Sequence, residues 1–289
     1  MNRKSKGIFY IILSAFFFAL MNIMVRLAGD LPSLEKSFFR NFVAFFFALY
    51  MVKREKIHLH YQRQEIKSLV LRALFGTLGI LGNFYAIDHM MVADASMLNK
   101  LSPFFAILFS VLLLKEKVKI MQILFVVLAF VGTLFILKPG FGIISPLPAL
   151  MGIMGGMCAG IAYTFVRKLG MMGVRGPLIV LFFSAFSCLV TLPLLVINFK
   201  PMTWEQVFFL LMAGLAASGG QFAITAAYTY APAREISIYD YTQILFATVL
   251  SFLILNQVPD KYSLIGYLII LLASLAMFFY NRAREKAEN

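Results

Sequence analysis

Long apolar segments recur along the whole chain, and this recurrence is the strongest constraint on its fold. A membrane-spanning helix needs about 20 consecutive, mostly apolar residues. About ten segments meet this requirement when short gaps with proline, glycine or charged residues are taken as their boundaries. They cover residues 7–28, 35–52, 69–88, 93–114, 119–137, 147–167, 176–197, 205–229, 233–255 and 262–280. The sequence therefore predicts an all-α membrane protein with about ten transmembrane helices.

The composition agrees with a chain whose solvent is the lipid bilayer. Of the 289 residues, 61% are hydrophobic and 13% are charged, and the mean hydropathy is +0.87. Soluble domains are nearer half apolar and about a quarter charged. The first apolar segment has the basic flank of a signal peptide, but it lacks a small-residue cleavage site and further spans follow it. We therefore expect a retained helix.

The basic residues are placed as in a membrane protein rather than a nucleic-acid-binding protein. The net charge is +13, and the Lys and Arg residues cluster in alternate gaps between the apolar segments, which is the positive-inside pattern. With the first residues in the cytoplasm, the outer gaps contain few of these residues: Lys36, Lys138, Lys200 and Lys261. The sequence predicts a multi-pass protein of the cell membrane, in contact with lipid, with both termini cytoplasmic and no nucleic-acid partner.

The two halves of the sequence align at a constant shift of 141 residues, which pairs Val25-Arg26 with Val166-Arg167. Identical residues recur at this shift in four consecutive pairs of segments: Gly29 and Gly170, Phe42 and Phe183, Ala44 and Ala185, Gly79 and Gly220, Ala86 and Ala227, Ser96 and Ser237. Each half contains about five spans, an odd number, so the second half must be inverted relative to the first. We expect two repeats, residues 1–143 and 144–289. Inverted repeats are common in secondary transporters, where substrate binds near the midplane between them.

Three segments carry a family resemblance. Residues 93–118 read ADASMLNKLSPFFAILFSVLLLKEKV, with an amphipathic start, a Ser-Pro in mid-helix and a closing Leu-x-Glu; residues 38–49 read FFRNFVAFFFAL and residues 72–87 read RALFGTLGILGNFYAI. They resemble the EamA family of the drug/metabolite transporter superfamily. The second copy departs from the pattern at Ile244 and Gln257. The resemblance implies two EamA-like five-helix repeats and carriage of small metabolites, often outward.

Polar residues inside the apolar segments are candidates for substrate binding. A charge in hydrocarbon costs about 2.5–3.5 kcal/mol on insertion scales and usually faces a cavity or a partner. Asn99 and Lys100 share one helical face with Ser96, and the shift of 141 residues pairs Asn99 with Asp240 and Lys100 with Tyr241. We expect both faces to line a central cavity. Spacing places Lys100 and Asp240 roughly 10 Å apart in height, so they need not touch; snorkelling is the alternative for Lys100.

Arg40 leads to a hypothesis about the substrate. It lies near the outer third of the second segment and, with Arg26 and Lys100, makes the outer half basic. Arginine can clasp a carboxylate through two N–H groups, so an organic anion or an amino acid carboxylate is the leading substrate hypothesis. The alternative is a structural ion pair of Arg40 with Asp94, or of Arg26 with Asp88.

Tyrosines and carboxylates complete the predicted site. Tyr163, Tyr239 and Tyr241 are candidates for stacking on a solute. Asp94 and Asp240 are candidates for coupling transport to a proton, because burial favours the protonated form of a carboxyl group. Other deep polar residues fit hydrogen bonding between helices and solute contact equally well: Asn22, Asn83 and Gln221.

Signatures of other chemistries are absent from the sequence. It contains no Walker loop, no His-Glu-x-x-His and no cysteine cluster, so we expect no cofactor, no metal site and no enzymatic activity. The prediction is a secondary transporter that exports or exchanges small metabolites by alternating access. A membrane-embedded lipid-handling enzyme or scramblase is the alternative; it needs a catalytic constellation near the lipid headgroups, and the longest cytoplasmic gap, residues 53–67, has only scattered charges.

Overall fold

Helices make up nearly all of the computed structural model, which describes residues 3–57, 63–114, 120–137, 146–197, 199–231 and 233–288, and these residues contain no strand. The helices are α1 Arg3–Leu27, α2 Ser33–Arg54, α3 Arg63–His89, α4 Val92–Asn99, α5 Ser102–Leu114, α6 Ile120–Leu137, α7 Pro146–Met171, α8 Gly176–Ile197, α9 Trp204–Tyr230, α10 Ala233–Asp240, α11 Thr242–Leu255 and α12 Lys261–Glu288. Helices satisfy their own backbone hydrogen bonds, which hydrocarbon cannot do for them. The all-α prediction is confirmed, while Lys138 and the predicted boundary at residues 143–144 lie outside the described residues.

The expected helix over residues 93–114 is divided into α4 and α5. It ends at Asn99 and resumes at Ser102, and Lys100 between them has φ −75° and ψ 7°. The Lys100 N–H bonds to the carbonyl groups three and four residues earlier, a tightening that is common where an α-helix ends. Pro103 follows as the second residue of α5, in the first turn, where its missing N–H group leaves no intrahelical bond unmade. The expectation of one continuous helix was wrong.

The expected helix over residues 233–255 is divided in the same way. α10 ends at Asp240 and α11 begins at Thr242. The N–H of Tyr241 between them bonds to the carbonyl group three residues earlier. Ile244 occupies the position that corresponds to proline in the first half. A proline is therefore not required for this interruption.

Eight regions of the described chain are long and apolar enough to cross a membrane, and a ninth, Ile123–Ile136, is shorter. Two of the eight, Val92–Phe109 and Ile238–Leu255, run through the helix breaks. α2 is not among the eight; charged residues at both of its ends lower its apolar character. The chain is thus a multi-pass helical membrane protein.

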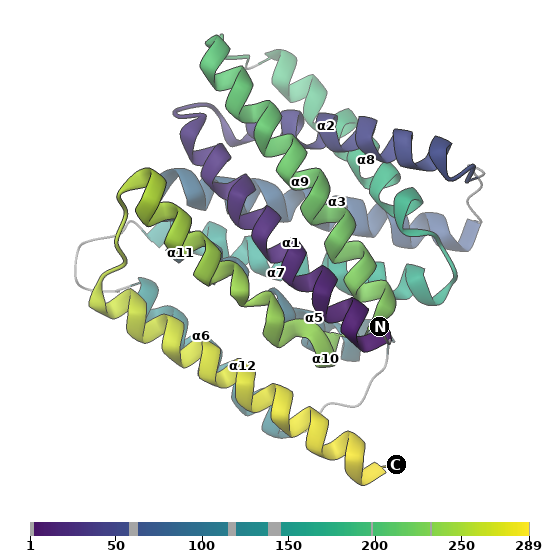
Figure 1. Cartoon of the computed structure of the whole chain (residues 1–289), viewed down its shortest axis with the longest axis vertical. Coiled ribbons are helices and arrows are strands. Elements are labelled where there is room, and N and C mark those ends of the chain that lie inside the picture. Colours follow the sequence, from purple (N-terminus) through teal and green to yellow (C-terminus); the bar gives the residue numbers. More distant parts are fainter. Residues whose placement is uncertain are drawn as a thin grey trace.

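The packing of the helices repeats when the two halves are exchanged. The shift of 141 residues relates α1 to α7, α2 to α8, α3 to α9, α4 and α5 to α10 and α11, and α6 to α12. The most extensive contacts are α1 with α9 and its counterpart α7 with α3. The contact of α1 with α11 is matched by that of α7 with α5, while α2 packs on its own counterpart α8 and α6 on α12 (Figure 1). A duplicated unit predicts this reciprocity.

Glycines bring α3, α4 and α7 close together around the centre of the molecule. A Cβ atom on Gly82 would lie 2.7 Å from the Met151 carbonyl oxygen, and one on Gly156 would lie 2.8 Å from the Leu98 carbonyl oxygen. Backbones that approach this closely require residues without side chains. The end of α4 is therefore seated directly on α7.

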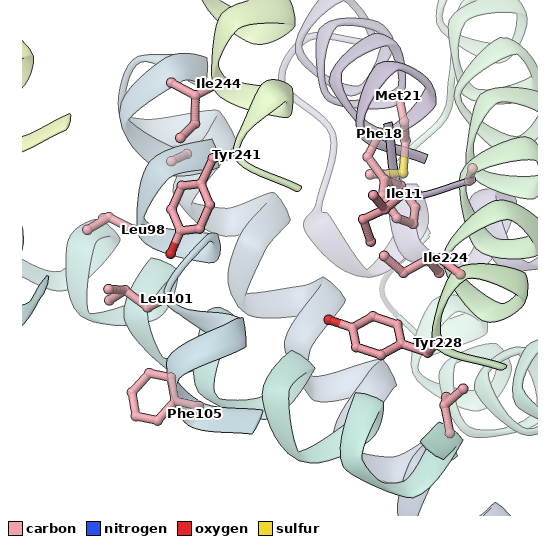
Figure 2. Close-up of a cluster of buried hydrophobic side chains, with 14 of the residues drawn as sticks. Ile11, Phe18, Met21, Leu98, Leu101, Phe105, Ile224, Tyr228, Tyr241 and Ile244 are labelled. Atoms are coloured by element: carbon pink, nitrogen blue, oxygen red, sulfur yellow. The ribbon is translucent and has the colours of Figure 1, made fainter. Parts of the chain in front are cut away.

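Buried apolar side chains from both halves surround the helix breaks. Leu98 and Leu101 flank the first break, and Tyr241 and Ile244 lie beside them from the second (Figure 2). The Tyr228 ring lies on the α1 and α9 side of the same core, with its hydroxyl group turned inward (Figure 2). Packing therefore holds both interruptions at the centre of the bundle.

Candidate substrate cavity between the two halves

A cavity of about 70 Å³ lies at the centre of the molecule, beside the break between α4 and α5. A water molecule needs about 10–15 Å³ of such space, so the cavity has room for several. Its polar lining from the first half comprises Asn22, Arg40, Arg72, Asn83, Asn99 and Lys100. The second half contributes Tyr163, Gln221 and Gln243. Both halves therefore build one polar site.

Lys100 and Asp240 form an ion pair at this site. Lys100 Nζ lies 2.7 Å from Asp240 Oδ1, and the two side chains are 4% and 1% exposed. Neither carboxylate oxygen of Asp240 forms a well-directed hydrogen bond with a described residue; at this distance the charges still interact directly, so we treat the contact as ionic. The expected separation of roughly 10 Å was wrong. It assumed two continuous helices, whereas α4 and α10 both end here and the side chains of Lys100 and Asp240 reach each other beside these ends.

A hydrogen bond also links the two helix breaks. The Tyr241 hydroxyl group donates to the Lys100 carbonyl oxygen at 2.9 Å. Lys100 and Tyr241 are 141 residues apart, which makes them equivalent positions of the two repeats. Residues that the repeat relates are therefore in direct contact at the centre.

Arg40 and Arg72 lie against the same aromatic ring. The guanidinium carbon of Arg72 lies 3.7 Å from the centroid of Phe183, and that of Arg40 lies 5.5 Å from it. Both arginines are 2% exposed. Arg40 also donates to Asn41 Oδ1 at 2.6 Å and to Gln221 Oε1 at 3.3 Å. Two guanidinium groups thus share one buried region.

Arg72 keeps N–H groups unused. Its Nε and Nη1 atoms have no hydrogen-bond partner among the described residues, and neither does Nε of Arg40. A Cβ atom on Gly76 would lie 2.3 Å from Arg72 Nη1 and 2.8 Å from the Phe183 ring, so this glycine makes room for the stacked group. No role was predicted for Arg72 from the sequence, although it is a charged residue inside an apolar segment, like Arg40.

Arg26 and Asp88 are neighbours, but in a different way from the ion pair considered above. Arg26 Nη1 donates at 2.6 Å to the main-chain carbonyl oxygens of Ile87 and Asp88. The Asp88 carboxylate is paired with Lys36. Lys36 was expected in an outer gap; it lies in α2 with its side chain buried. These contacts join the ends of α1 and α3 to the start of α2.

Asp94 and Tyr239 do not line this cavity. Asp94 accepts a 2.6 Å hydrogen bond from the Tyr267 hydroxyl group on α12. Tyr239 packs edge-on against Phe278, also on α12, with 6.2 Å between ring centroids. Tyr163 does line the cavity, and it stacks on Tyr228 at 5.2 Å. The residues predicted for binding or for coupling therefore divide between the cavity and the packing around it.

These features define a class of protein: a multi-pass helical membrane protein whose two halves enclose a charged internal cavity, as in many carriers. A family comparison makes the assignment specific. The EamA-like transporter family matches residues 5–138 and again residues 146–279. The chain therefore belongs to the EamA-like transporter family, and the predicted family resemblance is confirmed.

Relatives of known name cover almost the whole chain. The pseudopaline exporter CntI of Pseudomonas aeruginosa (strain UCBPP-PA14) is 30% identical over 273 residues, which are 94% of this chain and 95% of the exporter. The S-adenosylmethionine uptake transporter of Rickettsia prowazekii (strain Madrid E) is 25% identical over 283 residues, 94% of this chain and 92% of that protein. A solved crystal structure has a TM-score of 0.71 at 14% identity, over 97% of this chain and 99% of the other, which shows the fold. Both named relatives are transporters of small molecules.

Proposed function

We propose that this protein is a secondary transporter that exports or exchanges small metabolites with a carboxylate group. The observation that carries the proposal is the internal cavity lined by both halves, with two buried guanidinium groups whose N–H groups are partly unused. Guanidinium groups bind carboxylates through paired hydrogen bonds. The named relatives move different solutes in opposite directions, one outward and one inward, and the relative with the higher identity supports export.

In the proposed topology the chain crosses the cell membrane ten times as two inverted repeats, residues 1–143 and 144–289, with both termini in the cytoplasm. α4 with α5, and α10 with α11, then each make one crossing. The start of α1 and the end of α12 lie toward the same side of the molecule (Figure 1), as this topology requires. The distribution of Lys and Arg between alternate gaps supports the cytoplasmic location of that side.

The proposed roles of the site residues follow from their positions. Arg40, Asn99, Lys100 and Tyr163 line the cavity and would contact the solute directly. Asp240 would act through Lys100, because the two form an ion pair between the halves. Alternating access changes the relation of the halves, so this contact must rearrange during the cycle.

Tyr241 and Tyr239 are proposed to support the site rather than to bind solute. Tyr241 donates a hydrogen bond to the Lys100 carbonyl oxygen, and Tyr239 packs on Phe278 of α12.

Asp240 and Asp94 are the candidates for a coupling proton. Protonation of Asp240 would remove the counter-charge of Lys100 and so weaken a contact between the halves. Asp94 accepts a hydrogen bond from Tyr267, and its protonation would disturb this link between α4 and α12.

Counterflow in proteoliposomes tests the proposed function. Vesicles with purified protein are loaded with an unlabelled amino acid, monocarboxylate or dicarboxylate, and uptake of the same labelled compound is measured. We expect saturable counterflow for at least one compound and at least a tenfold loss in Arg40→Gln. Arg175→Gln is the matched control, because it removes an equal charge from an exposed ion pair with Glu55.

The alternative function has its own outcome in these vesicles. Movement of a fluorescent phospholipid between the leaflets, together with no counterflow of any compound, would favour a lipid scramblase. Folded wild-type protein without counterflow of any carboxylate would refute the proposed carboxylate transport.

A further inference from the structure

The charges around the cavity do not balance. Three cationic side chains line it: Arg40, Arg72 and Lys100. Asp240 neutralises Lys100. No carboxylate of the described residues is paired with either arginine: Asp88 and Asp240 are paired with Lys36 and Lys100, and Arg40 donates to the amide oxygens of Asn41 and Gln221.

The surroundings of Arg40 are similar. Besides Arg72, the ionisable groups that act on it are Tyr163 and Cys188. Tyrosine and cysteine side chains are mostly neutral at pH 7, so they do not compensate a guanidinium charge. Two positive charges therefore lie in the interior without an opposite charge from the described part of the protein.

Buried charges of this kind are unfavourable unless a partner compensates them. A cation–π contact such as those with Phe183 offsets only part of the free energy that desolvation of an ion costs. The Arg72 and Arg40 N–H groups without partners show where a compensating group would bind. Because both guanidinium carbons lie within 5.5 Å of one ring centroid, one small molecule can reach both.

We propose that the solute carries two carboxylate groups on one small molecule, one for each guanidinium group. This inference rests on the proposed transport function and narrows its substrate class. A dianion cancels the excess charge of the cavity, whereas a monoanion leaves one arginine uncompensated. The amide oxygens of Asn22 and Asn83, which belong to the lining and have no hydrogen-bond partner among the described residues, can accept an N–H group, so amino dicarboxylates fit the site.

Binding of matched compounds tests whether the solute carries two carboxylate groups. The compounds are succinate with succinamate, aspartate with asparagine, and glutamate with glutamine; each pair differs by one charge at nearly constant shape. Binding to the purified protein in detergent is followed by thermal stabilisation as a function of concentration, because a ligand of the native state raises its apparent stability. We expect at least one diacid to bind at least ten times more tightly than its amide.

Variants then assign the preference to the two arginines. Each variant keeps only one of the two guanidinium groups, so only one carboxylate of the solute can be bound by an arginine. Arg72→Gln and Arg40→Gln should therefore each reduce the preference for the diacid over its amide to less than about threefold. The control Arg175→Gln should retain the wild-type preference. Ligand-free melting and gel filtration establish folding, and Arg40→Gln decides the assignment if Arg72→Gln does not fold.

Equal binding of diacid and amide, or no binding of any of the three diacids, would overturn the inference. A preference that survives in both folded arginine variants would overturn it as well. Counterflow of a monocarboxylate in the same preparation would then leave the transport function standing, so failure of this inference is distinct from failure of that function.

Discussion

Removal of one partner of the Lys100–Asp240 ion pair should destabilise the protein more than removal of both. We consider Asp240→Asn, which leaves a buried lysine charge, and Lys100→Met, which leaves a buried carboxylate. The double variant has neither charge. Methionine is chosen because it replaces the lysine stem without a polar group that needs a partner.

The geometry sets the expected magnitude. Two unit charges at the observed 2.7 Å attract each other by about 6 kcal/mol at an effective dielectric constant of about 20. Screening by solvent is small because the side chains are only 4% and 1% exposed. Each single variant loses this attraction but keeps one desolvated ion, and such variants typically lose about 3–5 kcal/mol. The double variant also removes the desolvation cost of both ions, so it should lie within about 2 kcal/mol of the wild type.

The variants are compared by heating the detergent-solubilised protein and measuring the folded fraction by fluorescence-detected gel filtration. With about 2–4 °C of melting temperature per kcal/mol, each single variant should melt about 10 °C below the wild type. The double variant should melt above both single variants. A double variant whose loss equals the sum of the two single losses would show that the charges are not coupled, and the interpretation of the contact as an ion pair would be refuted.

Further predictions concern packing, the link between the helix breaks and topology. Gly160→Ala should lower the free energy of unfolding by about 1–3 kcal/mol, because its Cβ would lie 2.6 Å from the Ser102 carbonyl oxygen. Gly170→Ala, whose Cβ would lie 3.8 Å from its nearest neighbour, should leave the free energy of unfolding unchanged or raise it by up to about 1 kcal/mol, because alanine favours the helix. Both are measured as melting temperatures, and equal losses would contradict the close contact. Tyr241→Phe, which removes the hydrogen bond to the Lys100 carbonyl oxygen, should lower stability by about 1 kcal/mol; an unchanged melting temperature would count against this bond. Tags at the two termini should be accessible from the same, cytoplasmic side, and labelling from opposite sides would contradict the proposed inverted topology.

The sequence was sufficient to predict the helical membrane fold, because a simple physical requirement governs it. Apolar segments in lipid must satisfy their own backbone groups, and the apolar runs of this chain are long enough to identify. The repeat was also predictable, since the shift that pairs Gly79 with Gly220 has a counterpart in the reciprocal packing of the helices. Periodicity could not predict the breaks after Asn99 and Asp240, because a short interruption hardly alters the apolar pattern.

The site was only partly predictable. Charge inside an apolar segment identified Arg40 and Lys100, which line the cavity, and the same reasoning could have identified Arg72. Phe183 could not be found in this way, because a phenylalanine in an apolar helix has many possible roles. Its role depends on two guanidinium groups from α2 and α3 that meet its ring on α8, and such a meeting of three helices is a tertiary property.

The ion pair at the centre shows why two repeats must differ where they meet. Lys100 contacts its own repeat counterpart, Tyr241, and its charge is paired with Asp240, the counterpart of Asn99. An identical second copy would have asparagine at position 240, and the buried Lys100 charge would then lack its carboxylate partner, which is unfavourable in the interior. The second copy must therefore differ from the first at position 240 for this ion pair to form, so the loss of identity between Asn99 and Asp240 is as informative as the identities elsewhere. The alignment that reveals the repeat pairs Lys100 with Tyr241; the structure shows that these counterparts are also neighbours and that the complementary charge for Lys100 comes from Asp240, the residue before Tyr241.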